Sequence, residues 1–456
     1  MTHPQPTTQV PSRKALLAIC EQGLDLATQA GADHAEVALD WNREQEASLQ
    51  ANDLDQVRSS DETTIGIRVL VDGRPGFATT NRSDDLQATV DAAVAMARAA
   101  PPDPLAVLAS PQPYEDVPDA LDDGVLALSP ADLASMAMGE LRRIRALDPR
   151  LTIDSGAISA DISGRALASS SGIRAAWRCT SASGYLMGMA VDGKEVGSFA
   201  YDGDAVRRWA DLPHALEVAL QRFVDSSIGA LGATAGRSFR GAIVLPPHTF
   251  AELLISPLLG GLAADGVRTG TSPFKGRIGE SVAIPGLTVS AGGRGLAGHP
   301  VAPFDREGMP RVRRKVVDQG VLKGFFTDGR EAAAAGQASS GDAVGGAGSL
   351  PRPSATAVSV DRGTASIAAL EADGPVVIVT RWSGSTNPVS GEFSGVVKGG
   401  FLVENGERRP IRETTIAGNV WEALHQISAL SHDRSTFYGS SRYPWARVED
   451  VSVTAG

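Results

Sequence analysis

The sequence predicts an α+β protein: two N-terminal helix/antiparallel-strand units followed by a larger, mainly antiparallel β C-terminal domain with a few helices. Three observations predict this class. The chain has 456 residues, enough for roughly two to four domains. Its N-terminal half shows the order helix, several strands, helix twice. Beyond about residue 236 the chain is rich in glycine and in short strand-like runs, which is typical of a largely antiparallel domain.

The first unit is expected over residues 12–105 and begins with a helix from about Arg13 to Ala30. The apolar residues on one face of this helix are Leu16, Cys20, Leu24 and Ala27. Strands follow from His34 to about Val71, and an Asp72-Gly73 turn leads into a further short strand. Asp-Gly is a strong signal for a type I′ hairpin, since both central residues of that turn have positive φ. The unit closes with a helix capped by Ser83.

The second unit, expected over residues 128–232, repeats this order. Ser129 is a helix cap followed by Pro130 at the first helical position. The apolar stripe of this helix is Leu133, Ala137, Leu141 and Ile144. Strands are expected from Leu151 to about Tyr201, with Asp192-Gly193 in the place of the first unit's turn, before a closing helix over roughly residues 213–231. Between the units, residues 101–128 are rich in Pro, Asp and Ala, which is typical of a linker.

We expect a third domain over residues 236–456. It should open with a strand from Ala242 to Leu245 and a helix from Thr249 to Ala264. The later strand-like runs are Gly374 to Arg381, Gly395 to Val403 and Arg447 to Thr454. One further helix is expected from about Val420 to Leu430.

The composition argues against several classes of protein. A net charge of −11 disfavours a nucleic-acid surface, because phosphate binding depends on clustered Lys and Arg. No apolar run approaches the ~18–20 residues that a membrane helix needs, and the start of the chain lacks the apolar segment of a secretory signal. We therefore expect a cytoplasmic protein with no nucleic-acid and no membrane partner. Its two cysteines, Cys20 and Cys179, are expected to be core thiols rather than a disulfide.

Two short motifs match known sites but lack their structural context. The run Gly293 to Gly298 has the Gly-x-Gly-x-x-Gly spacing of a dinucleotide site, yet His299-Pro300 follows at once and no helix can open there. Ser272 and Lys275 have the Ser-x-x-Lys spacing of serine acylases, but no Lys-Thr-Gly or Ser-Asp-Asn partner is present. We reject the first motif and keep the second only as an alternative catalytic centre.

The seven histidines do not form a zinc-peptidase motif. A helical zinc peptidase needs two His one turn apart and a nearby carboxylate that accepts a proton from bound water. No two His in this chain are four or five residues apart. His248 and Glu252, at i and i+4, could supply two ligands, and His299 could complete the set. We expect instead that His248 and Glu252 lie at the exposed start of a helix.

Several segments of the C-terminal half occur in the order and spacing seen in the TldD/PmbA family. They are residues 304–308 (Phe-Asp-Arg-Glu-Gly), 318–322 (Asp-Gln-Gly-Val-Leu), 384–387 (Gly-Ser-Thr-Asn), 390–394 (Ser-Gly-Glu-Phe-Ser), 404–407 (Glu-Asn-Gly-Glu) and 416–419 (Ile-Ala-Gly-Asn). The N-terminal layout of two α/β units is also similar to that family. The chain therefore resembles the TldD/PmbA family over essentially its whole length after about residue 12.

The resemblance implies which kind of member this chain is. TldD-like members carry His-Glu-x-x-x-His on a helix shortly before a Gly-Thr-Ser segment, and residues 270–272 mark that place here. Counting back, the two His positions fall on Ile255 and Gly260, and the Glu position falls on Ser256. Residues 438–444 also lack the Cys that TldD-like members carry near the C-terminus. The chain thus looks like the PmbA kind, also called TldE, in which the metal-site positions are vacant.

The resemblance also implies a function and partners. A chain of this kind is expected to be a pseudo-enzyme subunit with no catalytic residue, metal or cofactor of its own, and zinc is expected only in a partner paralogue. The expected assembly is a heterodimer with a TldD-like zinc peptidase, or a homodimer, which processes unfolded and small peptides. "Modulator of DNA gyrase" is an older label for this kind. The residues expected to line the substrate cavity are Gly384, Ser385, Thr386, Asn387, Ser390 and Gly391.

Two other functions stay open. The chain could be a self-sufficient peptidase or hydrolase that uses Ser272 and Lys275, or His248 and Glu252, in place of zinc. It could also be a homodimeric peptide-binding module without a peptidase partner. The resemblance further suggests that substrate pairs with the main chain of an exposed strand edge. The residues do not identify that edge.

Overall fold

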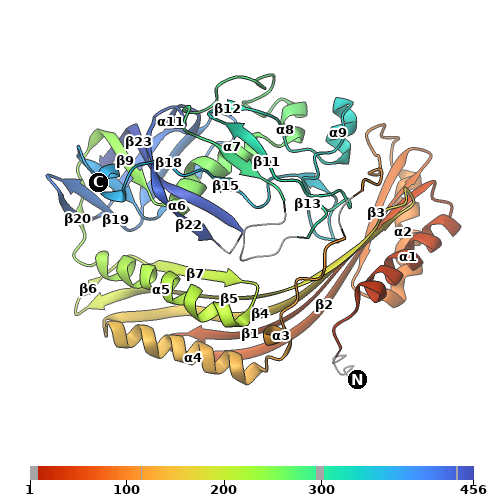
Figure 1. The fold of residues 1–456 in the computed structure, drawn as a ribbon, viewed down its shortest axis with the longest axis horizontal. Coiled ribbons are helices and arrows are strands. Elements are labelled where there is room, and N and C mark those ends of the chain that lie inside the picture. Colours follow the sequence, from red (N-terminus) through yellow and green to blue (C-terminus); the bar gives the residue numbers. More distant parts are fainter. Residues whose placement is uncertain (1–8, 114–115, 294–301, 438–439) are drawn as a thin grey trace.

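A computed structural model of the protein describes residues 9–113, 116–293, 302–437 and 440–456. Figure 1 shows a long, curved sheet built by the N-terminal half, with the C-terminal domain on its concave side. The C-terminal domain has a larger sheet of its own and several short helices. The α+β class and the predicted order of the parts are therefore confirmed.

The N-terminal sheet has the strand order β3-β2-β1-β4-β5-β6, with β7 also paired to β5. Its strands are β1 (His34–Gln50), β2 (Asp53–Val71), β3 (Arg74–Thr80), β4 (Leu151–Ser169), β5 (Arg174–Asp192), β6 (Glu195–Val196) and β7 (Ala200–Val206). Strand β1 pairs antiparallel with β4 from Glu36↔Ser169 to Gln50↔Ser155. The predicted units 12–105 and 128–232 thus contribute to one continuous sheet, and their boundaries as separate domains stay a prediction.

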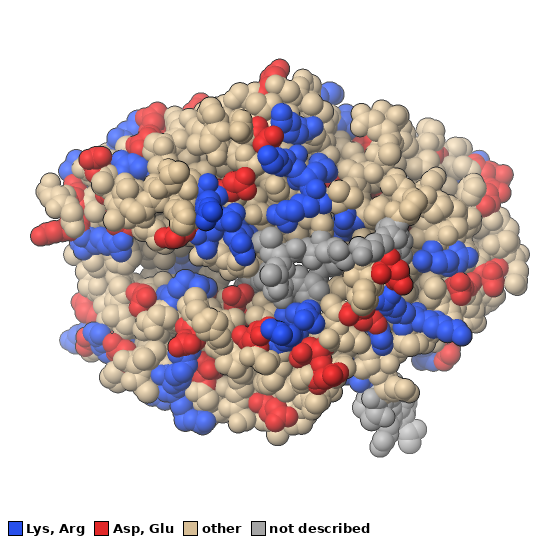
Figure 2. Space-filling view, viewed as in Figure 1, with Lys and Arg blue, Asp and Glu red and all other residues tan. Residues whose placement is uncertain are grey.

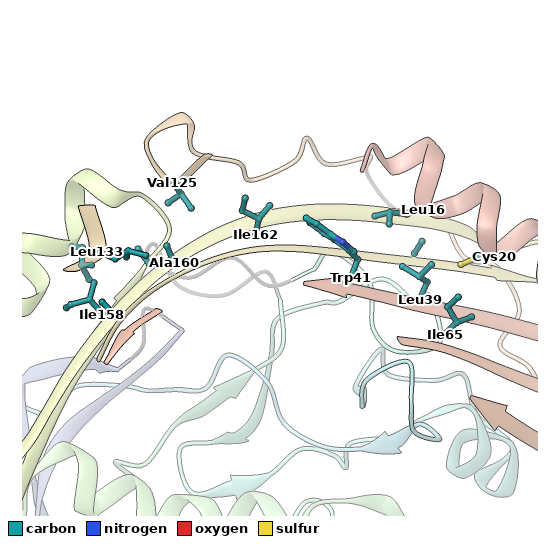
Figure 3. Packing of buried hydrophobic residues seen from close by; sticks show 14 of the residues in the cluster. Leu16, Cys20, Leu39, Trp41, Ile65, Val125, Leu133, Ile158, Ala160 and Ile162 are labelled. Atoms are coloured by element: carbon teal, nitrogen blue, oxygen red, sulfur yellow. The ribbon is translucent and has the colours of Figure 1, made fainter. Parts of the chain in front are cut away.

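Four helices cover one face of this sheet. They are α1 (Arg13–Gln29), α2 (Leu86–Ala99), α4 (Pro130–Leu147) and α5 (Leu212–Gly229). The predicted apolar stripes of α1 and α4 are buried, and Figure 3 shows Leu16 and Cys20 of α1 close to Leu39 and Trp41 of β1. Because side chains alternate along a strand, the residues between these apolar ones face the C-terminal domain. Helix α3 (Asp123–Leu126) lies in the segment predicted to be a linker.

The turn predicted for the first hairpin is confirmed. Asp72 and Gly73 have φ values of 51° and 69°, and a type I′ turn requires positive φ at both positions. In the second unit, Asp192 still pairs with Glu195 as part of the ladder. The turn there lies at residues 193–194, one position later than the sequence comparison suggested, and Gly193 alone has positive φ, at 60°.

The two predicted helix caps have different outcomes. Ser129 caps α4 in a capping box with Asp132, and Pro130 lies in the first turn, as predicted. The cap predicted at Ser83 is wrong. Residues Ser83–Asp85 form a separate 3₁₀ turn, so α2 begins only at Leu86. None of the helices in the described part of the chain has the length and apolar composition that crossing a membrane requires.

Among the described residues, the C-terminal sheet contains fourteen strands, and two further strands form a separate ribbon. The strands of the large sheet are β8 (Thr234–Ala235), β9 (Phe239–Leu245), β10 (Val289–Ala291), β11 (Arg314–Asp318), β12 (Val321–Leu322), β15 (Ser359–Val360), β16 (Val376–Val379), β17 (Trp382–Thr386), β18 (Glu392–Val397), β19 (Gly400–Glu404), β20 (Glu407–Arg412), β21 (Thr414–Asn419), β22 (Ile427–Phe437) and β23 (Ser441–Ala455). The ribbon is β13 (Ala343–Val344) with β14 (Arg352–Pro353). The long strand β23 pairs with β9, β15, β21 and β22 and therefore connects most of this domain.

Three predicted elements of this domain differ in the structure. The run 395–403 is two strands, β18 and β19, because the chain turns at Gly399, whose φ is 77°. The helix predicted to reach Leu430 is only α11 (Val420–Ala423), since Leu430 pairs with β23 as part of β22. The helix predicted from Thr249 is a run of α6 (Pro247–Phe250), a π turn (Ala251–Ile255) and α7 (Ser256–Gly261). The π turn ends two residues before Pro257, which lies in the first turn of α7 and has no N–H for an α-helical bond.

Three more short helices complete the domain. They are α8 (Ala264–Thr269), α9 (Gly329–Ala335) and α10 (Ile367–Leu370). At the start of α9 the main-chain N–H of Gly329 donates to Glu307, which also accepts from Arg68 of β2 in the N-terminal sheet. Helix α9 therefore belongs to the contact between the two parts of the molecule.

A buried network of charged side chains joins the C-terminal domain to the N-terminal sheet. The Arg306 guanidinium, 2% exposed, donates to Glu36 Oε1 at 2.9 Å. Arg68 of β2 donates to Glu36 Oε2 at 3.2 Å and to Glu307 Oε1 at 3.4 Å. Glu307 also accepts the N–H of Gly329 at 2.6 Å. Because Glu36 and Arg68 belong to the sheet and the other residues to the C-terminal domain, the network fixes one part against the other.

The backbone around this network approaches the sheet closely. A Cβ at Gly66 of β2 would lie 1.8 Å from the carbonyl oxygen of Ala347 in the C-terminal domain. Gly308 has a φ of 80°, and a Cβ there would lie 2.6 Å from the Ile173 side chain. Both positions thus require glycine. Gly66 allows the close approach of the backbone, and Gly308 allows both a close approach and a positive φ.

Replacing Arg306 by Met should destabilise the folded chain. Met fills a similar space but removes one cation from the buried network, and losing one partner of a buried ion pair costs about 3 kcal/mol or more. Urea unfolding followed by tryptophan fluorescence measures this change. Arg82→Met, at an exposed contact with Asp85, is the matched control and should hardly move the midpoint. An unchanged midpoint for Arg306→Met would mean that the network does not hold the domains together.

Glu307 should make the stability depend on pH. Burial raises the pKa of Glu307 to about 7 against the attraction of Arg68, while the ordinary value of 4.5 applies to the unfolded chain. The folded chain then binds more protons between these values, so the free energy of unfolding falls as pH rises from about 4.5 to about 7. Urea unfolding should show the wild type losing stability relative to Glu307→Gln over this window. The opposite trend would show that Arg68 and the Gly329 N–H keep Glu307 ionised.

Candidate functional site

The three positions identified with the zinc motif lie on the helical run from α6 to α7. Ile255 ends the π turn, and its side chain is fully buried in the apolar core of the C-terminal domain. Ser256 and Gly260 are exposed on α7. A Cβ at Gly260 would meet no atom within 4 Å. The helix therefore directs position 255 into the core, while positions 256 and 260 lie at the surface.

These residues do not fit a zinc ion. Zinc in proteins takes Cys sulfur, His nitrogen and carboxylate oxygen as ligands. A buried Ile side chain, a Ser hydroxyl and a glycine supply none of them. Within the ranges that the structure describes, no three His, Cys, Asp or Glu side chains gather so that they could hold a metal ion. His299, the third ligand considered for His248 and Glu252, lies outside those ranges.

Ser272 and Lys275 lie in different environments, one buried and the other exposed. The buried Ser272 hydroxyl donates to the carbonyl of Gly261 at 2.6 Å and accepts the N–H of Phe274 at 3.1 Å. These bonds fasten the segment after α8 to the end of α7. Lys275 is exposed and lines a separate cavity of about 530 Å³ beside α8 and α9. The Ser272 oxygen thus has a structural role, and no hydrogen bond to Lys275 activates it in the described part of the chain.

The segment predicted to line a substrate cavity is the hairpin between β17 and β18. Gly384, Ser385 and Thr386 belong to β17 and pair with β18. The Asn387 side-chain oxygen accepts the N–H groups of residues 389 and 390, which closes the turn, and the main-chain N–H of Asn387 donates to the carbonyl of residue 392. Gly391 has a φ of 80° and lies against the Trp421 ring. Ser385, Asn387 and Ser390 are exposed, and their role in holding substrate stays a prediction.

A cleft of about 410 Å³ lies elsewhere, between the two parts of the molecule. We call it the interdomain cleft. One wall is the start of β7 with α5; the other comes from α6, the β16–β17 junction, the β18–β19 turn and β22. At this end of the molecule, Figure 2 shows the surface hollowed between the upper and lower parts, with Lys and Arg side chains beside the opening. The hairpin 384–391 is not part of its lining.

Aromatic side chains from both parts meet in the interdomain cleft. Tyr201 of β7 lies with its hydroxyl 3.3 Å from Nε2 of His248, at the start of α6. The His248 ring also packs against Phe437 of β22, with 5.7 Å between ring centroids. The Arg381 guanidinium lies 5.9 Å from the centre of the Tyr201 ring and donates to the Ser198 hydroxyl at 3.3 Å. His248 was expected at an exposed helix start; it lies at that start but is half-buried in this wall.

Charge and burial shift the pKa values of two side chains beside these rings. Burial lowers the pKa of the Arg381 guanidinium, and nearby Tyr201 and Glu252 oppose the shift. Partial burial raises the pKa of the Glu252 carboxyl, while His248 and Arg381 act in the opposite direction. No hydrogen bond joins His248 to Glu252 among the described residues, so the pair does not form a hydrogen-bonded acid–base unit.

Sequence reasoning missed this cleft for a physical reason. Its walls come from separate segments around residues 200, 222, 248, 381, 400 and 437, and only the packing of the C-terminal domain on the sheet brings them together. His248 was singled out as a candidate metal ligand, but nothing linked it to Tyr201 or Arg381. The available signal was indirect: an aromatic residue at position 201, followed by Asp-Gly-Asp.

Two models of one protein family match the chain. The model described as the PmbA/TldA metallopeptidase C-terminal domain matches residues 238–455. The model described as PmbA/TldA metallopeptidase domain 1 matches residues 35–97, which hold most of β1 to α2. The first match includes the α6–α7 run and the C-terminal wall of the interdomain cleft.

Curated relatives and solved structures agree with these models. "Metalloprotease PmbA" of Escherichia coli O157:H7 is 26% identical over 434 residues, 93% of this chain and 93% of the relative. The crystal structure of TldE from Thermococcus kodakarensis has a TM-score of 0.84 at 23% identity and covers 96% of this chain and 100% of that one. A Thermotoga maritima structure described as a modulator of DNA gyrase has a TM-score of 0.81 at 22% identity, over 96% and 99% of the chains. The chain belongs to the TldD/PmbA family of metalloprotease-related proteins.

Proposed function

We propose that this chain is the zinc-free subunit of a TldD-type peptidase, a pseudo-enzyme that holds unfolded or small peptides for a zinc-bearing paralogue. The observation that carries the proposal is the chemistry of three positions, Ile255, Ser256 and Gly260. In a TldD-like member these positions carry His, Glu and His. Here one is an apolar side chain packed into the core and another has no side chain. Zinc and the water-activating carboxylate are therefore assigned to the partner.

Two further points support the proposal. The relative from Escherichia coli matches nearly full length and bears the name PmbA, and the Thermococcus structure bears the name TldE. Proteins that share a fold can form symmetric or pseudosymmetric dimers, in which an inactive copy supplies half of an enclosed site. We infer a heterodimer with the paralogue as the working assembly, and the alternative is a homodimer. The net charge of −11 supports an assembly without direct nucleic-acid contact.

A self-sufficient hydrolase is the second candidate, and one observation favours it. His248 contacts the Tyr201 hydroxyl in the interdomain cleft, and a His beside a hydroxyl is a common element of acid–base catalysis. The arrangement lacks an orienting carboxylate, because Glu252 is not hydrogen-bonded to His248 in the described residues. The Ser272/Lys275 alternative has less support, since the Ser272 hydroxyl already makes two loop bonds.

Reconstitution tests the proposal. The purified chain should cleave no quenched fluorescent peptide alone. It should form a heterodimer when it is mixed with the paralogue of the same organism that carries His-Glu-x-x-x-His. This heterodimer should cleave the peptide, and a chelator should abolish the cleavage. Lys275→Ala in this chain is the control and should leave the rate of the pair unchanged, because the exposed Lys275 side chain makes no hydrogen bond to Ser272 in the described part of the chain. Cleavage by this chain alone in the presence of chelator would instead support the second candidate.

A further inference from the structure

The lining of the interdomain cleft holds more cations than carboxylates. Its charged residues are Arg222, Arg381, Lys398, Arg408, Asp202 and Asp225. Two of the four cations have partners: Arg222 binds Asp202 through two bonds of 2.8 Å, and Arg408 binds Glu371 at 2.8 Å. Arg381 and Lys398 make no ion pair with any residue in the described ranges. In a chain with a net charge of −11, the cleft is thus a local site of positive charge.

Arg381 is held in place by neutral groups alone. Its guanidinium donates to the Ser198 hydroxyl and to the carbonyl of Phe199, and lies over the Tyr201 ring. These contacts fix its orientation without neutralising its charge. A half-buried cation without an ion-pair contact costs free energy, and the nearby Glu252 carboxyl offsets only part of that cost. A guanidinium also presents a planar set of donors that matches a carboxylate. The site is therefore preorganised for an anionic group with two oxygens.

The surroundings of Arg381 favour an apolar group beside that anion. The rings of Tyr201, His248 and Phe437 form one continuous row from one wall of the cleft to the other, with centroid distances of 6.1 and 5.7 Å between successive rings. Phe401 and Trp445 also line the cleft. Its volume of about 410 Å³ lies within the range of about 300–1,000 Å³ that ligand sites occupy. A ligand that fits has a carboxylate next to an apolar side chain, which describes the last residue of a peptide.

The edge of β7 disfavours the other way of holding a peptide in this cleft. A peptide that adds to a sheet needs unpaired main-chain donors along the edge strand. The N–H groups of Gly203 and Ala205 are instead bonded to the Asp202 and Asp204 carboxylates, each at 2.8 Å. Acidic side chains that engage an edge in this way protect it against strand addition. The cleft is therefore better suited to capture a chain end than to pair with an extended segment.

We propose that the interdomain cleft binds the C-terminal carboxylate of a peptide, with Arg381 as its main ligand and Lys398 as a second cation. The Tyr201, His248 and Phe437 row receives the side chain of the peptide's last residue. This assignment rests on the proposed function as a peptide-holding subunit and specifies which end of the peptide the subunit holds. It also predicts a preference for apolar or aromatic C-terminal residues.

Binding to the purified full-length chain tests the assignment. Two six-residue peptides that end in Phe and carry an N-terminal fluorophore, one with a free carboxylate and one amidated, are compared by fluorescence anisotropy. The free acid should bind about tenfold or more tightly than the amide, since a charge-assisted bond is lost. Arg381→Gln should remove this preference, and Arg381→Lys should restore part of it. Arg240→Gln, at an ion pair outside the cleft, is the control and should bind like the wild type.

Several outcomes would overturn the assignment. Equal affinity for acid and amide would do so, as would an acid preference that survives Arg381→Gln in a variant with an unchanged thermal midpoint. Tight binding of an amidated peptide with an internal Glu would show that Arg381 binds side-chain carboxylates instead of the peptide's C-terminal carboxylate. Loss of the acid preference together with normal cleavage by the reconstituted pair would remove only this assignment. Acid-specific binding by a chain that never supports cleavage would uphold it and contradict the peptidase-subunit role.

Discussion

The buried contact between Arg306 and Glu36 is the interaction on which the arrangement of the molecule depends. It lies where the C-terminal domain meets the concave face of the sheet, and Arg68 and Glu307 extend it to both sides. A buried ion network of this kind adds little net stability over an apolar contact, but it tolerates few alternative arrangements. It therefore defines how the two parts are placed. The interdomain cleft follows from that placement, because each part supplies one wall.

The local elements of the fold could be predicted because they depend on neighbouring residues. The α1 stripe, the capping box at Ser129 and the Asp72-Gly73 turn each follow from short-range chemistry, and all are present. The predictions failed where distant pairing decided the outcome. Leu430 joined a strand because β23 was available to pair with it, and β1 paired with β4 more than a hundred residues away. Neither partner is visible in the local pattern, so two similar units could not be recognised as one sheet.

The candidate site also has one part that residue types predict and another part that only the packing of distant segments creates. The chemistry of Ile255, Ser256 and Gly260 can be read from residue types once the family motif is aligned, and the structure adds that position 255 points into the core. The cleft around Tyr201 and Arg381 could not be read in this way, since its members are spread along the chain. Under the proposed function, a subunit without a zinc site can still keep a second surface for substrate. We thus propose two separate tasks within the family fold: cleavage by a partner and retention of the peptide by this chain.

The central claim is that this chain has no zinc site of its own, and its metal content tests that claim most directly. The purified chain is dialysed against a trace of free zinc, and zinc is then counted per chain by elemental mass spectrometry. The account predicts a value near zero, because Ile255, Ser256 and Gly260 offer no ligand. A value near one zinc per chain would contradict it, and would make His248, Glu252 and His299 the residues to replace.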